Sequence, residues 1–150
     1  MESNYATARV TAVNRDNYLV QGKPGEVLAE LSGEFLYSAA DSGDYPVVGD
    51  VAEVRYFNDD TLAIIYGVRP RRTLLRRKTA GRKVDYQMIA ANIDTACIVQ
   101  SCDFNFNLRR LERYLVMVRE GDIEPVILLS KADLVSPEAV SYTHLTLPTN

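Results

Sequence analysis

The stretch PVILLSKADL, Pro125–Leu134, decides how the second half of this chain is interpreted. Four apolar residues, Val126–Leu129, predict a buried strand, and polar residues follow at its carboxyl end. Open α/β sheets place their ligands at that end of the strands. Asp133 can there accept two hydrogen bonds from the N1–H and exocyclic amine of guanine, while the Lys131 stem lies over the base. Adenine lacks this pair of donors, so the loop Ser130–Asp133 is predicted to recognise guanine.

The four residues of the candidate guanine-binding loop are Ser130, Lys131, Ala132 and Asp133. A bare Lys-x-Asp is a common pattern, but the apolar run before it and Leu134 after it make the signal more specific. Such loops usually begin with Asn, or with Thr in some proteins, so Ser130 keeps a hydroxyl but departs from the commonest pattern. The alternative is an ordinary strand-to-helix turn in which Asp133 caps the next helix.

A second buried strand is predicted upstream, at Ile93–Val99. Between the two strands, Asn107 can cap a helix through its side-chain oxygen, and Gly121 is a stop signal. Apolar residues recur between them at helical spacing, at Leu108, Leu111, Leu115 and Val118. Strand, helix and strand predict a right-handed parallel crossover of the α/β class. Two strands and one helix do not bury both faces of a parallel sheet, so this unit is expected to be incomplete in the chain.

The first 68 residues predict an all-β domain instead. Polar NRDN at Asn14–Asn17 and NDD at Asn58–Asp60 indicate two hairpins, and Ser38–Pro46 is predicted to be a long loop. Five short strands are expected, at Tyr5–Val13, Tyr18–Val20, Val27–Leu31, Val51–Phe57 and Thr61–Val68. They fit a small closed barrel, for which the OB-fold is the leading candidate and an SH3-like barrel the competitor.

A basic strip joins the two halves. Eight of the 15 residues in Arg69–Lys83 are basic and none is acidic: Arg69, Arg71, Arg72, Arg76, Arg77, Lys78, Arg82 and Lys83. Of the 17 basic residues in the chain, nine therefore remain elsewhere against 20 acidic ones, a net charge of −11 outside the strip. Such a strip on an acidic body predicts contacts with RNA phosphates, which position a protein without reading sequence. The alternative is a solvated linker.

Other classes of protein are disfavoured. The chain has no apolar run of about 20 residues and no secretory signal, and the phosphate-loop pattern G-x-x-x-x-G-K-[ST] does not occur in it. Two cysteines and one histidine do not make a zinc site, so no metal ligand is predicted. Cys97 and Cys102 are expected to be buried or half-buried reduced thiols, as in a cytosolic protein.

The order of these features resembles one family, the circularly permuted GTPases of small ribosomal subunit maturation. In them an OB-fold precedes a GTPase domain whose guanine motif comes before its phosphate loop. Five stretches carry the resemblance and cover most of residues 5 to 139: PVVGDVAEV (Pro46–Val54), RRTLLRRK (Arg71–Lys78), QMIAANIDTACIV (Gln87–Val99), LRRLERYLVMV (Leu108–Val118) and IEPVILLSKADL (Ile123–Leu134).

The resemblance implies a monomeric, cytoplasmic GTPase that binds GTP or GDP with Mg²⁺, carries zinc in a C-terminal region and binds 16S-type ribosomal RNA of the small subunit, with no membrane partner. The guanine contacts carry over to Lys131 and Asp133, and the RNA-binding role to the barrel and the basic strip. The family's phosphate loop, Mg²⁺ residues and zinc ligands lie downstream of the guanine motif. No catalytic or metal residue is therefore assigned in this chain.

The expected layout is an OB-fold RNA-binding domain at 1–70, a basic linker at 71–85, the first segment of a permuted P-loop GTPase domain at 86–139, and a non-native tail at 140–150. The chain by itself is expected to hydrolyse no GTP, because everything that holds the phosphates is missing from it. The rival hypothesis is a non-enzymatic OB-fold RNA-binding module, in which the α/β segment is only structural.

Overall fold

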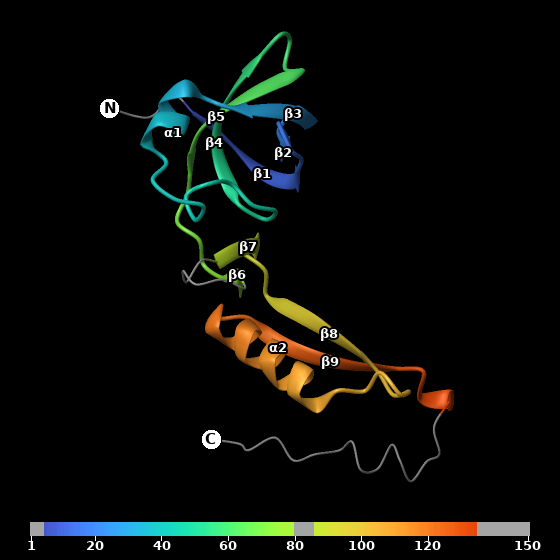
Figure 1. Ribbon diagram of the computed structural model, residues 1–150. Coiled ribbons are helices and arrows are strands. Elements are labelled where there is room, and N and C mark those ends of the chain that lie inside the picture. The colour runs from blue at the N-terminus through green and yellow to red at the C-terminus, as the bar shows by residue number, and fades with distance from the viewer. Residues whose placement is uncertain (1–4, 80–85, 135–150) are drawn as a thin grey trace.

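The computed structural model describes residues 5–79 and 86–134. A barrel, a β-hairpin and a strand–helix–strand unit follow one another from one end of the molecule to the other (Figure 1). The predicted tail at 140–150 and two residues of the basic strip, Arg82 and Lys83, lie outside the described residues. Within the described ranges, no helix is long and apolar enough to cross a membrane.

Five strands close into the barrel: β1 (Ala6–Val13), β2 (Tyr18–Gly22), β3 (Gly25–Leu31), β4 (Val51–Phe57) and β5 (Leu62–Val68). Their order around the barrel is β1-β2-β3-β5-β4, with β4 pairing back to β1. β3 and β5 pair in parallel and the other neighbours pair antiparallel. This arrangement is the predicted OB-fold, and the SH3-like alternative is set aside. Every predicted strand agrees with its observed bounds to within two residues.

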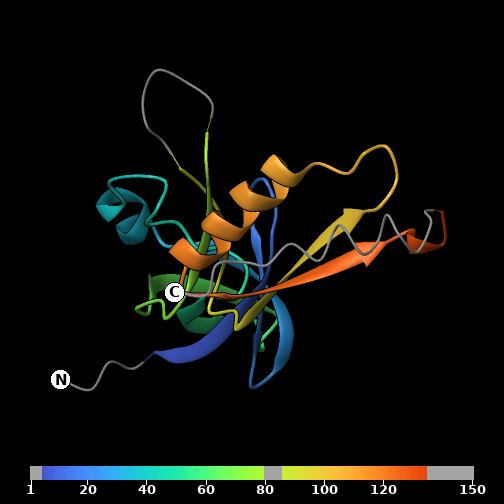
Figure 2. The ribbon, with the colours of Figure 1, turned by 90° about the horizontal axis from the view of Figure 1, so that it is seen from below.

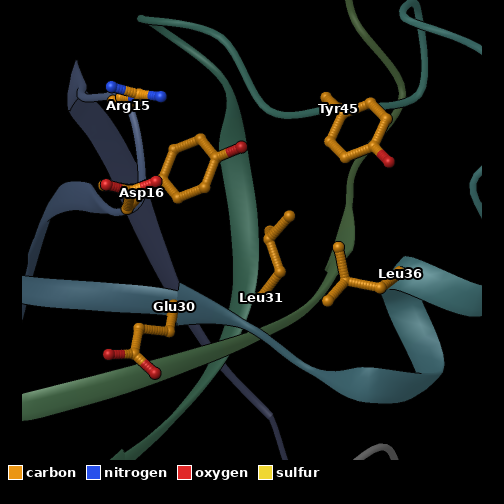
Figure 3. A pocket seen from close by; sticks show the side chains of 7 residues that line it. Arg15, Asp16, Glu30, Leu31, Leu36 and Tyr45 are labelled. Atoms are coloured by element: carbon orange, nitrogen blue, oxygen red, sulfur yellow. The ribbon is translucent and has the colours of Figure 1, made fainter.

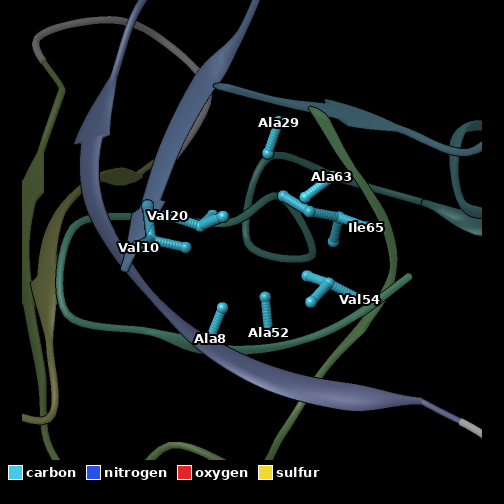
Figure 4. Packing of buried hydrophobic residues seen from close by; sticks show 8 residues of the cluster. All are labelled: Ala8, Val10, Val20, Ala29, Ala52, Val54, Ala63 and Ile65. Atoms are coloured by element: carbon cyan, nitrogen blue, oxygen red, sulfur yellow. The ribbon is translucent and has the colours of Figure 1, made fainter. Parts of the chain in front are cut away.

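Small side chains fill the barrel, because five strands enclose little space. Inward and outward positions alternate along each strand, so that Ala8 and Val10 of β1 are buried while Thr7 and Arg9 are exposed. The buried cluster is shown in Figure 4 and consists of Ala8, Val10, Val20, Ala29, Ala52, Val54, Ala63 and Ile65.

A short helix, α1 (Gly33–Ser38), follows β3 at a place where no helix is predicted. The Ser32 hydroxyl oxygen accepts a hydrogen bond from the Phe35 amide at 3.0 Å and so caps the helix. Phe35 is its one buried residue. A helix of under two turns leaves almost no periodic pattern in the sequence, which explains why it escapes prediction.

The predicted linker contains regular structure. Within 71–85, residues Leu74–Lys78 form strand β6, which pairs antiparallel with β7 (Tyr86–Ala91) as a separate two-stranded sheet. The expectation of two strands in the second half therefore misses β7, whose partner is the basic strip and not the parallel sheet.

The hairpin β6–β7 contacts both neighbours. On the barrel side, the Ala91 amide donates to the Val48 carbonyl at 2.8 Å. On the other side, the Leu74 amide donates to the Gly121 carbonyl at 3.1 Å, and Leu75 packs against the core of the strand–helix–strand unit. The segment thus joins the two lobes through main-chain hydrogen bonds, which a freely solvated linker would not make.

The predicted strand–helix–strand unit consists of β8 (Thr95–Ser101), α2 (Leu108–Glu120) and β9 (Glu124–Ser130), and one 3₁₀ turn, η1 (Ala132–Leu134), follows. β8 and β9 pair in parallel. Asn107 caps α2 as predicted, since its Oδ1 accepts from the Arg110 amide at 2.9 Å. α2 covers one face of the strand pair (Figure 2), and the core between them holds Ile98, Leu111, Val118 and Ile123.

The opposite face of β8 and β9 is not covered by any described residue. Cys97 is exposed, and Val99 and Leu128 are 64% and 46% exposed. The prediction of two buried strands, with Cys97 as a buried or half-buried thiol, is therefore wrong for this face. One helix covers one side of a parallel sheet, and the other side needs a second layer. Cys102, in the loop after β8, is half-buried as predicted.

Candidate functional site

The predicted guanine loop lies at the carboxyl end of β9. Ser130 is the last residue of that strand, and Lys131 has a left-handed backbone, with φ of 57°. Ala132–Leu134 then form the η1 turn, in which the Leu134 amide donates to the Lys131 carbonyl at 3.2 Å. The loop leaves the sheet edge in one tight turn, and the Lys131 side chain lies on the outside of it, exposed.

The loop after β8 lies beside it, because β8 and β9 are parallel neighbours that end together. The Cys102 amide donates to the Ser130 carbonyl at 2.9 Å, and Lys131 Nζ donates to Asp103 Oδ2 at 2.7 Å. Ser130 thus joins the two loops through its main-chain carbonyl.

Asp103 is held from three sides. Besides Lys131, its carboxylate accepts from the Ser101 hydroxyl at 2.8 Å and from the Asn105 amide at 3.0 Å. The hydrogen bond from Lys131, followed by those from Asn105 and Ser101, lowers the pKa of Asp103 to about 2. The carboxylate is therefore charged at neutral pH.

A second network of hydrogen bonds supports the loop after β8. The Gln100 side chain is only 3% exposed, and its Nε2 donates to the Asn105 carbonyl at 3.2 Å. Arg110, in the first turn of α2, donates to that carbonyl at 2.7 Å and to Gln100 Oε1 at 3.3 Å. Gln100 and Arg110 thus connect β8, its loop and α2 next to the candidate site.

Asp133 is exposed, and its carboxylate has no hydrogen bond or ion pair with any described residue. The amides that Asp133 would cap, two and three residues further on, lie outside the described residues. The alternative helix-cap role therefore stays open.

The basic strip separates into three groups. Arg71 belongs to the structure: its side chain is 16% exposed, and it donates to both oxygens of Asp50 and to the Gly43 and Tyr45 carbonyls. Because its guanidinium is already engaged, Arg71 is less available to an RNA phosphate than its basic neighbours, and its contact with RNA stays a prediction. Arg69 pairs with Glu53 at 3.5 Å.

Arg72 forms an exposed ion pair with Asp94. The three remaining described members, Arg76, Arg77 and Lys78, lie on β6 and are exposed. None of the three has an acidic partner among the described residues. Within the described residues they are the part of the strip whose charge is not paired, and they are called the β6 cations below.

The β6 cations have neutral neighbours on β7. The Arg76 guanidinium lies over the Tyr86 ring, 4.3 Å from its centroid, and Arg77 donates to Gln87 Oε1 at 2.7 Å. Both contacts orient a guanidinium without neutralising it. An arginine oriented in this way can still contact a phosphate.

A pocket of about 420 Å³ opens on the barrel (Figure 3). Arg15 and Asp16 line one side of it and Leu36 and Tyr45 the other; Tyr18, Glu30 and Leu31 complete the lining. Two carboxylates against one guanidinium make the pocket unfavourable for phosphate. Among the described residues no group of three His, Cys, Asp or Glu side chains could hold a metal ion.

Two functional relationships were not predicted, the Asp103–Lys131 pair and the Asp50–Arg71 pair. A signal for the first exists in the sequence. Asp103 follows β8 as Lys131 follows β9, and two parallel strands bring such residues to one edge. Asp103 also caps its own loop, by accepting from the Asn105 amide. No comparable signal exists for the second pair.

In this chain an OB-fold is followed by a parallel unit that carries the Lys-x-Asp loop, and no phosphate loop precedes that unit in the sequence. This order of elements defines the first part of a circularly permuted GTPase. Solved structures share this fold. YloQ, titled a circularly permuted GTPase, aligns with a TM-score of 0.64 and 22% identity over 94% of this chain and 46% of its own. YjeQ from Thermotoga maritima aligns with a TM-score of 0.68 and 19% identity over 93% of this chain and 46% of its own.

The family follows from sequence. The model of the RsgA GTPase family matches residues 68–147, more than half of the chain, and the chain belongs to this family. Among curated relatives, small ribosomal subunit biogenesis GTPase RsgA 1 of Bacteroides thetaiotaomicron is 41% identical over 126 residues, which are 84% of this chain and 35% of that protein. The RsgA of Opitutus terrae is 35% identical over 140 residues, 87% of this chain and 38% of that protein. The chain thus spans a little over a third of the length of these relatives.

Proposed function

We propose that the complete protein containing this chain is a cytoplasmic, monomeric GTPase that acts in small ribosomal subunit maturation and binds its 16S-type RNA. Membership of the RsgA GTPase family and the names of the relatives support this proposal. The observation that carries it is the position of Lys131 and Asp133 at the carboxyl end of a parallel strand, with the Asp133 carboxylate exposed.

Guanine recognition by this loop follows from hydrogen-bond donors. Asp133 accepts from the N1–H and the exocyclic amine of guanine, and the Lys131 stem covers the face of the base. An adenine would leave the carboxylate desolvated and unpaired. Sites that pair a substrate's donors in this way discriminate by roughly 10⁴–10⁵. Ser130 and Ala132 complete the loop without contacting the base edge.

Hydrolysis depends on parts beyond the described residues. Water attacks the γ-phosphate in line, and backbone donors, a lysine and Mg²⁺ stabilise the charge that spreads over the phosphate oxygens. None of those groups is assigned among the described residues, where no group of three His, Cys, Asp or Glu side chains could hold a metal ion. The role of this segment in the reaction is to select the base and to contact RNA. The 150-residue chain by itself hydrolyses no GTP on this proposal, and single-turnover activity above the blank would contradict it.

RNA contact is assigned to the barrel and to the β6 cations, together with Arg69 and Arg72, whose ion pairs are exposed enough to exchange for phosphate. Arg82 and Lys83 belong to the same strip in sequence. Counterion release makes such binding salt-dependent and insensitive to sequence.

The test of the nucleotide assignment is Asp133→Asn in a complete protein that contains this segment. The side-chain amide of Asn carries an N–H donor that would face the exocyclic amine of guanine, which is also a donor. Xanthine has a carbonyl oxygen at that position, which can accept from the Asn amide. We expect preference to shift from GTP toward XTP in a competition assay. Asp122→Asn is the matched control, because Asp122 is exposed, outside the loop and in a left-handed conformation that Asn tolerates. An unchanged GTP preference in Asp133→Asn would refute the role of the loop.

The second candidate function is a non-enzymatic RNA-binding module, which the exposed β6 cations favour. RNA binding that weakens with salt, in a complete protein with no affinity for guanine nucleotides, would select this function over the GTPase.

A further inference from the structure

The loops that follow β8 and β9 form one unit at the edge of the sheet. Their strands end opposite each other, with Ser101 paired to Ser130. Beyond that pair the loops remain joined, first by the Cys102 amide on the Ser130 carbonyl and then by Lys131 on Asp103. The base-recognition loop therefore has a partner loop from a neighbouring strand.

The Asp103 carboxylate is anchored before it meets Lys131. Its Oδ1 accepts from the Ser101 hydroxyl and the Asn105 amide, which leaves Oδ2 directed at the ammonium. The Asp103 side chain is 9% exposed, whereas that of Lys131 is 52% exposed. A fixed carboxylate thus holds the end of a long, otherwise mobile side chain.

We propose that Asp103 is a positioning residue for Lys131, one that holds the lysine stem in the place where it covers the guanine base. This inference rests on the proposed guanine site. A free lysine loses rotamer freedom when a nucleotide binds, and a lysine already held by Asp103 loses less. The ammonium has three N–H donors, so one bond to Asp103 leaves two for other acceptors in the bound state.

A double-mutant cycle in a complete protein tests the positioning role. Asp103→Asn retains an oxygen for Ser101 and Asn105 but removes the charge that attracts Lys131. We expect about three- to tenfold weaker GDP binding in this variant. In the Lys131→Met background the same substitution should change the Kd less than about twofold. Asp94→Asn, which removes an exposed carboxylate paired with Arg72, is the control and should leave the Kd unchanged.

The outcomes separate three cases. Equal weakening in both backgrounds would mean that Asp103 only shapes its own loop, and no weakening in either would mean that it does not act on the site; both overturn the proposal. Absence of any GDP binding in the unsubstituted protein overturns the guanine site itself, and the positioning role with it.

A nucleotide-free measurement isolates the pair. Carboxyl-carbon NMR of the 150-residue chain should give Asp103 a pKa of about 2, rising toward the ordinary value in Lys131→Met. An Asp103 carboxyl that titrates in the ordinary range with Lys131 present would overturn the proposal whatever the nucleotide data show.

Discussion

Arg71 binds Asp50 through two parallel hydrogen bonds, Nε to Oδ1 at 2.9 Å and Nη2 to Oδ2 at 2.8 Å. Asp50 is fully buried and also accepts from the Val47 amide at 2.8 Å. The pair fixes the segment that follows β5 against the loop that leads into β4. The basic strip therefore contains one structural residue, whereas Arg69 and Arg72 form exposed ion pairs and the β6 cations have no acidic partner among the described residues.

Arg71→Ala should destabilise the chain strongly. The substitution leaves the Asp50 carboxylate buried without its counter-charge, which typically costs about 3–5 kcal/mol. Urea unfolding, followed by circular dichroism, would measure the loss. Arg72→Ala is the matched control, because its ion pair with Asp94 is exposed on both sides and contributes about 0–1 kcal/mol. Similar losses in the two variants would contradict the structural role of Arg71.

Gly49→Ala should destabilise the junction between barrel and hairpin. An added Cβ would lie 2.0 Å from the Ala91 carbonyl oxygen, and φ at this residue is +94°. We expect the free energy of unfolding, measured with urea, to fall by more than about 1 kcal/mol, because the conformational strain and the backbone clash add.

Two other glycines separate the causes. Gly25→Ala should lose stability through backbone strain alone, because φ is +119° and no atom lies within 4 Å of the new Cβ. Gly33→Ala introduces neither backbone strain nor a clash, so it should leave stability unchanged or raise it slightly. A Gly49→Ala variant no less stable than Gly25→Ala would show that the close approach to Ala91 is not maintained.

The barrel was predictable because its information is local. The bounds of the strands follow from the alternation of apolar and polar residues and from the turns at Asn14–Asn17 and Asn58–Asp60. Five strands that close into a barrel can be arranged in only a few orders. The position of the loop Ser130–Asp133 was predictable for a similar reason, since the apolar strand before it sets where it leaves the sheet. Its contacts with guanine stay a prediction.

Long-range pairings were not predictable. β7 contains QMIAA, whose apolar residues do not reveal that its partner is the charged strand β6. Arg71 looks like its basic neighbours until the fold brings Asp50, 21 positions earlier, against it. The exposed face of β8 and β9 is a different case, because apolar residues there indicate burial by a layer that the described residues do not include.

Removal of the β6 cations should reduce the salt dependence of RNA binding. Each phosphate contact contributes about 0.7–0.9 to the slope of log K against log salt, so replacing Arg76, Arg77 and Lys78 by Ala should lower it by about 2 to 3. Binding to a ribosomal RNA fragment over a salt series gives this slope. Removing Arg109, Arg113 and Arg119 from the exposed side of α2 is the charge-matched control. An equal change in both variants would assign the effect to net charge and not to the hairpin.

The Asp103–Lys131 pair should make stability depend on pH in the acid range. The pKa of Asp103 is about 2 in the folded chain, below its ordinary value of 3.8, chiefly because Lys131 donates to it. A carboxyl whose folded pKa is lowered contributes stability above its unfolded pKa and loses it as pH falls toward the folded value. The difference in unfolding midpoint between the natural chain and Asp103→Asn should therefore be constant above about pH 5 and shrink between about pH 4 and pH 2. In the Lys131→Met background this dependence should flatten, because the largest cause of the lowered pKa is gone. A difference that stays constant from pH 6 to pH 2 would show that Asp103 gains nothing from its partner in the folded chain.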